Sequence, residues 1–216
     1  MYVGGLFMDN TRISKKLLKR LPIYLSYLKS LPENSNISAT SIAKALGLGD
    51  VQVRKDLAKV AGTGRRRVGR GREQLIQEIE EYLDFAVHTG TVIVGTGKLG
   101  RALLDYGGFE ESGLNVMAGF DINPCSDRSE NGKPIYSLTR LEQFCKHYDV
   151  HIGVITVPAE NAQQVCDCMV ACGIRAIWNF APVHLRVPDY VVVKSENLAV
   201  SLTALRLQMK NQEMNC

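Results

Sequence analysis

Residues 91–104 read Thr91-Val-Ile-Val-Gly95-Thr-Gly97-Lys-Leu-Gly100-Arg-Ala-Leu-Leu104. The stretch predicts a buried strand, a tight turn and a helix, because β-branched residues precede the glycines and helix formers follow them. Gly95 can adopt the backbone angles of the turn, Gly97 lets main chain come close to a pyrophosphate, and Gly100 lets helix and strand pack tightly. The N-terminus of the helix would direct its free N–H groups at the phosphates.

An acidic residue follows at the distance that nucleotide-binding folds require. In these folds a carboxylate about 20 residues beyond the glycines accepts a hydrogen bond from a ribose hydroxyl. Asp121 stands in that place, at the end of the apolar segment 114–120. We therefore expect an adenine dinucleotide, and NAD rather than NADP, because a carboxylate repels a 2′-phosphate. The alternative is that the glycines only close a strand-to-helix turn.

The second part of the chain alternates short apolar runs with helical patterns, which predicts an α/β fold with a mostly parallel sheet covered on both faces. We expect strands at 91–94, 116–120, 150–156, 176–178 and 191–193, and helices at 98–106, 138–147, 159–171 and 198–209. Ligands of such sheets bind at the carboxyl ends of the strands. The residues expected there are Gly95, Thr96, Gly97, Lys98, Leu99, Gly100, Asp121, Ile122, Thr156, Val157, Pro158, Asn179, Phe180, Ala181 and Pro182.

Charge is divided unequally along the 216 residues. Residues 1–72 hold 15 Lys and Arg against 4 Asp and Glu, or +11, whereas residues 73–216 hold 11 against 18, or −7. The net charge of +4 hides this asymmetry. It predicts a basic domain that meets a polyanion and an acidic domain that does not.

The basic part has the pattern of a helix-turn-helix. Apolar residues recur at helical spacing from Ile13 to Leu28, and Pro22 within them predicts a kink or two short helices. Ser38 would cap a short helix over 39–46, and Gly47 would end it. Asp50 would cap the next helix over 51–60. Two short helices joined by Gly-Leu-Gly are typical of the motif, whose second helix enters the major groove of DNA.

Polar and basic residues of this part are candidates for DNA contacts. Residues 62–72 contain five arginines among glycines and predict a basic wing that contacts phosphates or the minor groove, although a solvated loop would have the same composition. Arginine is also the residue best suited to recognise guanine. The DNA-binding set comprises Lys15, Lys16, Ser41, Gln52, Arg54, Lys55, Lys59, Arg65, Arg66, Arg67, Arg70 and Arg72.

Catalytic and metal-binding residues are not evident in the pattern. A hydride-transfer enzyme needs a general acid or base, and only His184 of the four histidines follows a strand. The cysteines form no CxxC pair, which argues against a zinc site, while Cys168 and Cys172 share a helix face and leave a thiol sensor as an alternative. Without an apolar run of about 18 residues or a signal segment, we expect a cytoplasmic protein.

We expect three segments. Residues 1–86 would form a winged helix-turn-helix domain with a linker helix, 87–195 a Rossmann-type domain, and 196–216 a C-terminal helix. The helix at 198–209 is apolar on most of its circumference, so a second subunit should cover it and make a homodimer.

This combination resembles the redox-sensing transcriptional repressor Rex family of bacteria, over nearly the whole chain. The motifs that carry the resemblance are the glycine turn, Lys19-Arg-Leu-Pro-Ile-Tyr24, Tyr27-Leu-Lys-Ser-Leu31, Gln52-Val-Arg-Lys-Asp-Leu57, Ile155-Thr-Val-Pro-Ala-Glu160, Asn179-Phe-Ala-Pro-Val183 and Leu185-Arg-Val-Pro188. The runner-up is an enzyme, either a small NAD-dependent dehydrogenase or a relative of the coenzyme A-binding domains that the acidic part also resembles.

The resemblance implies a homodimer with exchanged C-terminal helices that represses genes by binding an inverted-repeat operator. It also implies release of the operator when NADH binds, competition by NAD⁺ without release, and a place for Tyr106 near the cofactor. Two features depart from the family. The wing is richer in arginine, and Asn197 replaces an aspartate that makes a redox-sensitive contact across the dimer, so the operator sequence and the strength of the response stay open.

Overall fold

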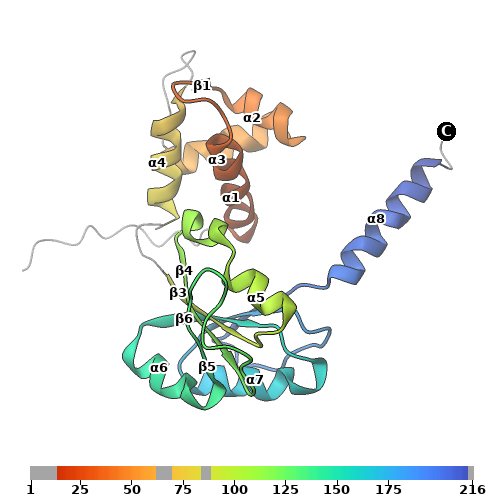
Figure 1. Cartoon of the computed structure of the whole chain (residues 1–216). Helices are drawn as coiled ribbons and strands as arrows, with labels where there is room; N and C mark the ends of the chain where they lie inside the picture. Colours follow the sequence, from red (N-terminus) through yellow and green to blue (C-terminus); the bar gives the residue numbers. More distant parts are fainter. Residues whose placement is uncertain (1–13, 62–69, 84–88, 214–216) are drawn as a thin grey trace, which may run out of the picture. The chain divides into compact units, whose positions relative to one another are not determined.

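The computed structural model describes residues 14–61, 70–83 and 89–213 (Figure 1). The chain divides into two compact units, residues 1–87 and 88–216, each of which is described by itself. The finer boundaries expected at residues 86 and 195 stay predictions.

The first unit is a small helical bundle with one short antiparallel strand pair. Its elements are α1 (Lys15–Lys29), β1 (Asn36–Ile37), α2 (Ala39–Leu46), α3 (Asp50–Ala61), β2 (Arg70–Gly71) and α4 (Arg72–Tyr82). The core gathers the apolar faces of all four helices, including the fully buried Leu21, Tyr24, Ile42, Val53 and Ile79. The helix-turn-helix of the sequence pattern is thus α2 and α3, and β2 pairs with β1 at the end of the segment expected to form the wing.

The helix ends confirm two predicted caps and correct a third. Ser38 caps α2 through a capping box with Ser41, and Gly47 ends it in the left-handed region at φ 64°. Asp50 is not a cap, because α3 begins at Asp50 itself and the Gly49 carbonyl accepts the N–H groups of residues 52 and 53. The Asp50 carboxylate instead pairs with Arg54 at 2.8 Å.

Pro22 does not divide α1 into two helices. The element is continuous from Lys15 to Lys29, and Pro22 lies on its exposed side. Leu21 and Tyr24 on either side are fully buried, so packing of the apolar face holds the helix together despite the lost backbone hydrogen bond.

The second unit is a six-stranded parallel sheet in the order β5-β4-β3-β6-β7-β8. The strands are β3 (Thr89–Val94), β4 (Leu114–Asp121), β5 (Ile135–Ser137), β6 (Val150–Ile155), β7 (Ala176–Asn179) and β8 (Val192–Ser195). The helical elements are α5 (Lys98–Leu104), η1 (Gly107–Ser112), η2 (Leu138–Arg140), α6 (Leu141–His147), α7 (Ala159–Ala171) and α8 (Leu198–Glu213). Helix α7 has the predicted bounds, whereas β5 was missed because three residues are too short to show a period.

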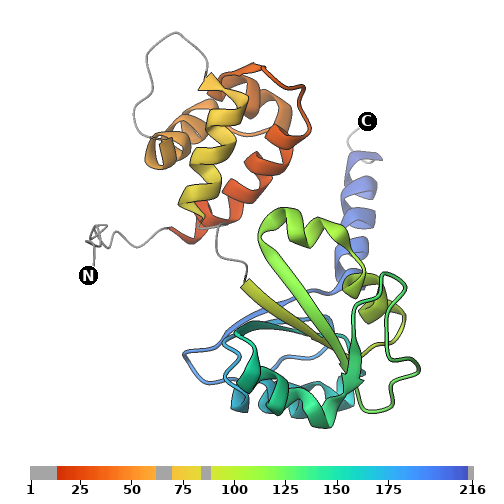
Figure 2. The ribbon, with the colours of Figure 1, turned by 60° about the vertical axis from the view of Figure 1, so that its left-hand side comes forward.

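Two apolar clusters cover the two faces of the sheet. Val92 and Val94 of β3 face α6 and α7, while Ile93 faces α5 and η1 on the other side (Figures 1 and 2). The alternation follows from the strand period of two residues. Both faces are therefore buried, as expected for a parallel sheet, and its strand ends meet at one edge.

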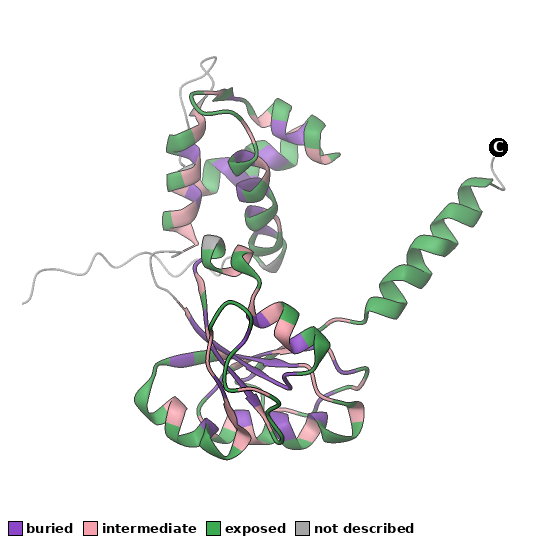
Figure 3. Ribbon diagram, viewed as in Figure 1, coloured by how far each residue is buried: buried purple, intermediate pink, exposed green. Residues whose placement is uncertain are grey.

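Helix α8 is exposed along its whole described length (Figure 3). Its apolar side chains are between 52% and 69% exposed, a set made of Leu198, Val200, Leu202, Leu205, Leu207 and Met209. No described helix is both long and apolar enough to cross a membrane.

The β3–α5 turn gives a stability prediction from a matched pair of glycines. A Cβ at Gly100 would collide with the carbonyl oxygen of Gly95, whereas a Cβ at Gly97, at φ −69°, would meet nothing within 4 Å. Gly100→Ala should therefore destabilise the second unit by about 1–3 kcal/mol. Thermal unfolding checks this. Gly97→Ala is the control and should unfold close to the parent protein, and equal stability of all three chains would contradict the packing described.

Candidate functional site

A cavity of about 490 Å³ lies at the carboxyl ends of β3, β4 and β6. Predicted residues form one wall of it, namely Gly95, Gly97, Asp121, Ile122, Thr156, Val157 and Pro158. The rest of the lining comes mainly from α7 and was not predicted; its residues are Asn161, Gln164, Val165 and Cys168, with Leu138 from η2. The α7 residues recur at helical spacing after a strand end, a pattern that could have pointed to them.

The glycine turn is fixed by hydrogen bonds from its neighbours. Gly95 has φ 97°, and a Cβ there would come within 2.9 Å of the Thr156 main chain and of the Val157 side chain. The Thr156 hydroxyl donates to the Gly95 carbonyl at 2.7 Å, and Arg101 Nε donates to the Thr96 carbonyl at 3.0 Å. These contacts hold the turn in shape, and of its three glycines only Gly97 has open space where a Cβ would lie.

Asp121 connects the ends of β3 and β4. Its Oδ2 accepts the Thr96 N–H at 2.7 Å and the Thr96 hydroxyl at 3.1 Å, and its Oδ1 accepts the Asn123 N–H at 3.0 Å. Partial burial opposes ionisation, but the backbone donors of Asn123 and Thr96 outweigh it, so the pKa of Asp121 lies below its ordinary value. A carboxylate therefore faces the cavity at neutral pH.

The structure does not bring every predicted nucleotide contact to the cavity. Lys98 and Leu99 are exposed in the first turn of α5, while Thr96 and Gly100 are buried. Asn179 is fully buried, because its amide donates to the carbonyls of Ala181 and Val183 and accepts the Ala181 N–H. Residues 180–182 follow it in this loop and do not line the cavity. Nucleotide contacts by the residues of this paragraph remain predictions.

Tyr106 also lies outside the cavity lining, at one end of a row of aromatic rings. Tyr106 is 57% exposed, and its ring meets that of Phe109 edge to face at 4.9 Å between centroids. Phe109 meets Trp178 at 6.0 Å, and Trp178 meets Phe180 at 4.5 Å. The row joins the segment after α5 to the end of β7.

The first unit presents a polar and basic face on α3. Gln52, Lys55 and Lys59 share this exposed face, and Arg54 is exposed further round the helix, while Val53 and Leu57 are buried. Lys16 is exposed on α1, and the Ser41 hydroxyl is exposed but occupied in the capping box. Of the other predicted contacts, Arg65, Arg66 and Arg67 lie outside the described residues, as do the side chains of Lys15 and Arg70.

Arg72 is placed differently from the prediction. Its Nε donates to the Leu28 carbonyl at 2.8 Å, and a terminal nitrogen donates to the Lys29 carbonyl at 3.1 Å. The third nitrogen pairs with Glu73, and only 14% of the side chain is exposed. Arg72 thus binds two main-chain carbonyls of the last turn of α1. The DNA contact expected of Arg72 stays a prediction.

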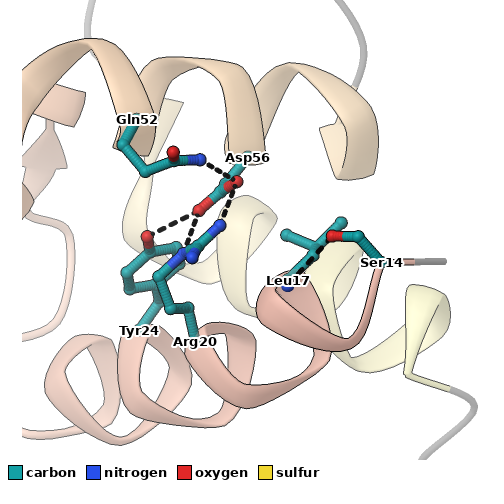
Figure 4. A network of polar contacts seen from close by, with 6 residues as sticks. All are labelled: Ser14, Leu17, Arg20, Tyr24, Gln52 and Asp56. Carbon is teal, nitrogen blue, oxygen red and sulfur yellow. Dashed lines mark hydrogen bonds and ion pairs between the residues drawn. The ribbon is translucent and has the colours of Figure 1, made fainter.

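A buried ion pair joins α1 to α3 (Figure 4). Asp56 is 3% exposed and accepts hydrogen bonds from Arg20 Nε at 2.6 Å, from the Tyr24 hydroxyl at 2.9 Å and from Gln52 Nε2 at 2.8 Å. Burial opposes ionisation of Asp56, yet these donors lower its pKa below the ordinary value. Burial, aided by the carboxylate, raises the pKa of Tyr24 to about 12.

The thiols offer little support for a cysteine sensor. Burial, with Cys168 and Cys145 nearby, raises the pKa of Cys172 to about 12, and burial also raises that of Cys145. Reactive cysteines need a lowered pKa, because the thiolate is the nucleophile. Cys168 lies instead in the wall of the cavity.

The hydrogen bonds of Asp121 predict a pH-dependent stability. Its native pKa is below the unfolded value of about 3.9, so the carboxylate contributes stability above that pH and loses it as the pH falls through the native pKa. Asp121→Asn should therefore be less stable than the parent at pH 7, with the difference shrinking below pH ~4. Urea unfolding of both chains across this range measures it, and a difference independent of pH would contradict the assignment.

Known proteins match both units. Residues 12–58 match a family model described as "Putative DNA-binding protein N-terminus", and residues 87–183 match one described as "CoA binding domain". A protein of Porphyromonas gingivalis named redox-sensing transcriptional repressor Rex is 38% identical over 208 residues, which cover 95% of each chain.

Two solved structures of RSP, a Rex-family repressor, extend the similarity to the fold. The complex of RSP with beta-NAD+ and operator DNA has a TM-score of 0.84 and 32% identity, and covers 95% of this chain and 96% of its own. The complex of RSP with beta-NADH has a TM-score of 0.82 and 31% identity, over 95% and 98% of the two chains. The chain therefore belongs to the Rex family of redox-sensing transcriptional repressors, a family of DNA-binding regulators and not of enzymes.

Proposed function

We propose that this chain represses transcription as a homodimer on an inverted-repeat operator and releases the operator when NADH binds its second unit. The observation that carries the proposal is the cavity at the strand ends, where the Asp121 carboxylate, the open space above Gly97 and an apolar wall from α7 lie together. The basic face of α3 supplies the complementary surface for DNA.

The cavity fits the adenosine part of a dinucleotide. Asp121 would accept hydrogen bonds from the ribose hydroxyls, and the absence of a side chain at Gly97 leaves room for the pyrophosphate. Val157, Val165 and Leu138 give the apolar surface that an adenine ring needs. Because Asp121 is ionised, it would disfavour the 2′-phosphate of NADP.

The RSP structures support binding of operator DNA and of the dinucleotide. That repressor was solved with operator DNA and beta-NAD+, and with beta-NADH. A ligand shifts a conformational equilibrium only by its different affinity for the two states. We infer that NADH favours a state of the dimer in which the two α3 helices no longer match successive half-sites of the operator.

The second copy of the chain would cover α8. Six large apolar side chains along this helix are exposed, which is costly for a helix in water. The swap of α8 between subunits, implied by the resemblance to the Rex family, would bury them. Asn197 accepts the Val200 N–H at 3.0 Å and so caps α8, which gives the residue a part in forming the helix independently of any charge.

A direct test titrates NADH into the complex of the full chain with an inverted-repeat duplex selected by this protein. Fluorescence anisotropy of the labelled duplex should fall as NADH is added, and NAD⁺ should compete with NADH while leaving the complex intact. Equal release by both forms would overturn redox sensing, and no release by either would overturn the proposed regulation.

Arg54→Ala should weaken binding to the selected duplex by about 1–3 kcal/mol if Arg54 contacts a base edge. Its ion pair with Asp50 is exposed, so the substitution should leave the fold intact. Lys146→Ala removes the same charge from α6 and serves as the control. A loss confined to the salt-dependent binding of unrelated DNA would make Arg54 a phosphate contact instead.

The dimer prediction concerns the exposed face of α8. Leu205→Glu should shift the protein towards monomers, because a charge replaces an apolar side chain that the partner would bury. Light scattering after size exclusion measures the mass. Gln208→Glu adds the same charge on the same helix outside the apolar set and should remain dimeric, whereas a dimer that tolerates Leu205→Glu equally well would contradict the role of α8.

A further inference from the structure

Gln52 is exposed on α3, yet one end of its amide is held by a buried group. Its Nε2 donates to Asp56 Oδ1 at 2.8 Å, one helical turn away (Figure 4). Asp56 is itself fixed from α1, because Arg20 donates to both of its oxygens, at 2.6 Å and 2.9 Å, and Tyr24 donates to Oδ2 at 2.9 Å. The anchor of the Gln52 side chain is thus a carboxylate with almost no freedom to move.

This contact decides which way the Gln52 amide faces. A carboxylate only accepts hydrogen bonds, so the amide nitrogen must be the end that meets Asp56. The Oε1 atom and the second hydrogen of Nε2 are left free of Asp56, on the exposed side of the helix that also carries Lys55 and Lys59. An acceptor and a donor side by side are what the major-groove edge of adenine requires, since its N6 donates and its N7 accepts.

We propose that Asp56 is a positioning residue for base recognition, which orients Gln52 so that it binds an adenine in each half-site of the operator. The inference rests on the function proposed above. Asp56 already has three hydrogen bonds from α1, so Gln52 is not needed to satisfy its charge. The contact instead orders the flexible side chain of Gln52 before DNA binds. Gln52 then loses less conformational entropy on binding than a side chain that is free to rotate.

The test compares three variants on one set of duplexes. The full chain first selects its preferred inverted repeat from a randomised pool, and each base pair of that duplex is then changed in turn. Gln52→Ala removes the amide, and Asp56→Asn replaces the carboxylate, which only accepts hydrogen bonds, by a neutral amide that no longer requires the nitrogen of Gln52 to face it. Tyr24→Phe is the matched control, because it removes one hydrogen bond to Oδ2 and leaves the contact of Gln52 with Oδ1 in place.

The expected result is specific to one base pair of each half-site. There, Gln52→Ala should lose a preference for adenine of about tenfold or more. Asp56→Asn should lose most of the same preference, because the orientation of the Gln52 amide is then no longer fixed. Tyr24→Phe should keep the preference. Thermal unfolding of each variant shows that its first unit is folded under the conditions of the assay.

Three outcomes would overturn the inference or its basis. If Asp56→Asn weakens binding to every duplex equally and keeps the adenine preference, Asp56 is only structural. If Tyr24→Phe loses the preference as fully as Asp56→Asn, general weakening of the ion pair explains the effect. If the parent chain selects no duplex from the pool, the proposed function itself fails and the inference with it.

Discussion

The close contact between Gly100 and the carbonyl of Gly95 sets the geometry of the second unit. It brings α5 against β3 with no side chain between them, which turns the start of the helix towards the strand ends. The Thr156 hydroxyl then binds the Gly95 carbonyl and Asp121 binds the Thr96 N–H, so β6 and β4 are tied to the same turn. Three neighbouring strands thereby end around one cavity, and the site depends on a contact that only glycine permits.

The first unit depends in the same way on one buried interaction, the ion pair of Arg20 with Asp56. A charge pair in a small apolar core stabilises less than its short distances suggest, because both groups must leave water. The main effect of the ion pair is to orient the two helices relative to each other. The pair holds α1 and α3 in one relative position. Because Gln52 donates to the same carboxylate, the pair also fixes the orientation of the Gln52 amide on the exposed side of α3.

Patterns of several residues predicted the fold well, whereas the hydrogen-bond partners of single side chains could not be predicted from the sequence. The glycine turn, Asp121 and the bounds of α7 follow from period and spacing, which the backbone imposes on any sequence. Arg72 and Asn179 both bind main-chain carbonyls of the folded protein. The sequence does not reveal which carbonyls lie within reach of a given side chain. The same is true of Gln52, whose hydrogen-bond partner lies in the core. It is also true of the α7 residues that line the cavity, because they come together with the strand ends only in the folded unit.

In the proposed function, NADH and the operator bias one equilibrium of this chain in opposite directions. Linkage requires such an effect to be reciprocal, since each ligand must change the affinity of the other by the same factor. The most direct measurement is the dissociation constant of NADH with and without a saturating amount of the selected duplex. We predict weaker NADH binding in the presence of the duplex, by the factor with which NADH weakens DNA binding. An unchanged NADH affinity would contradict it.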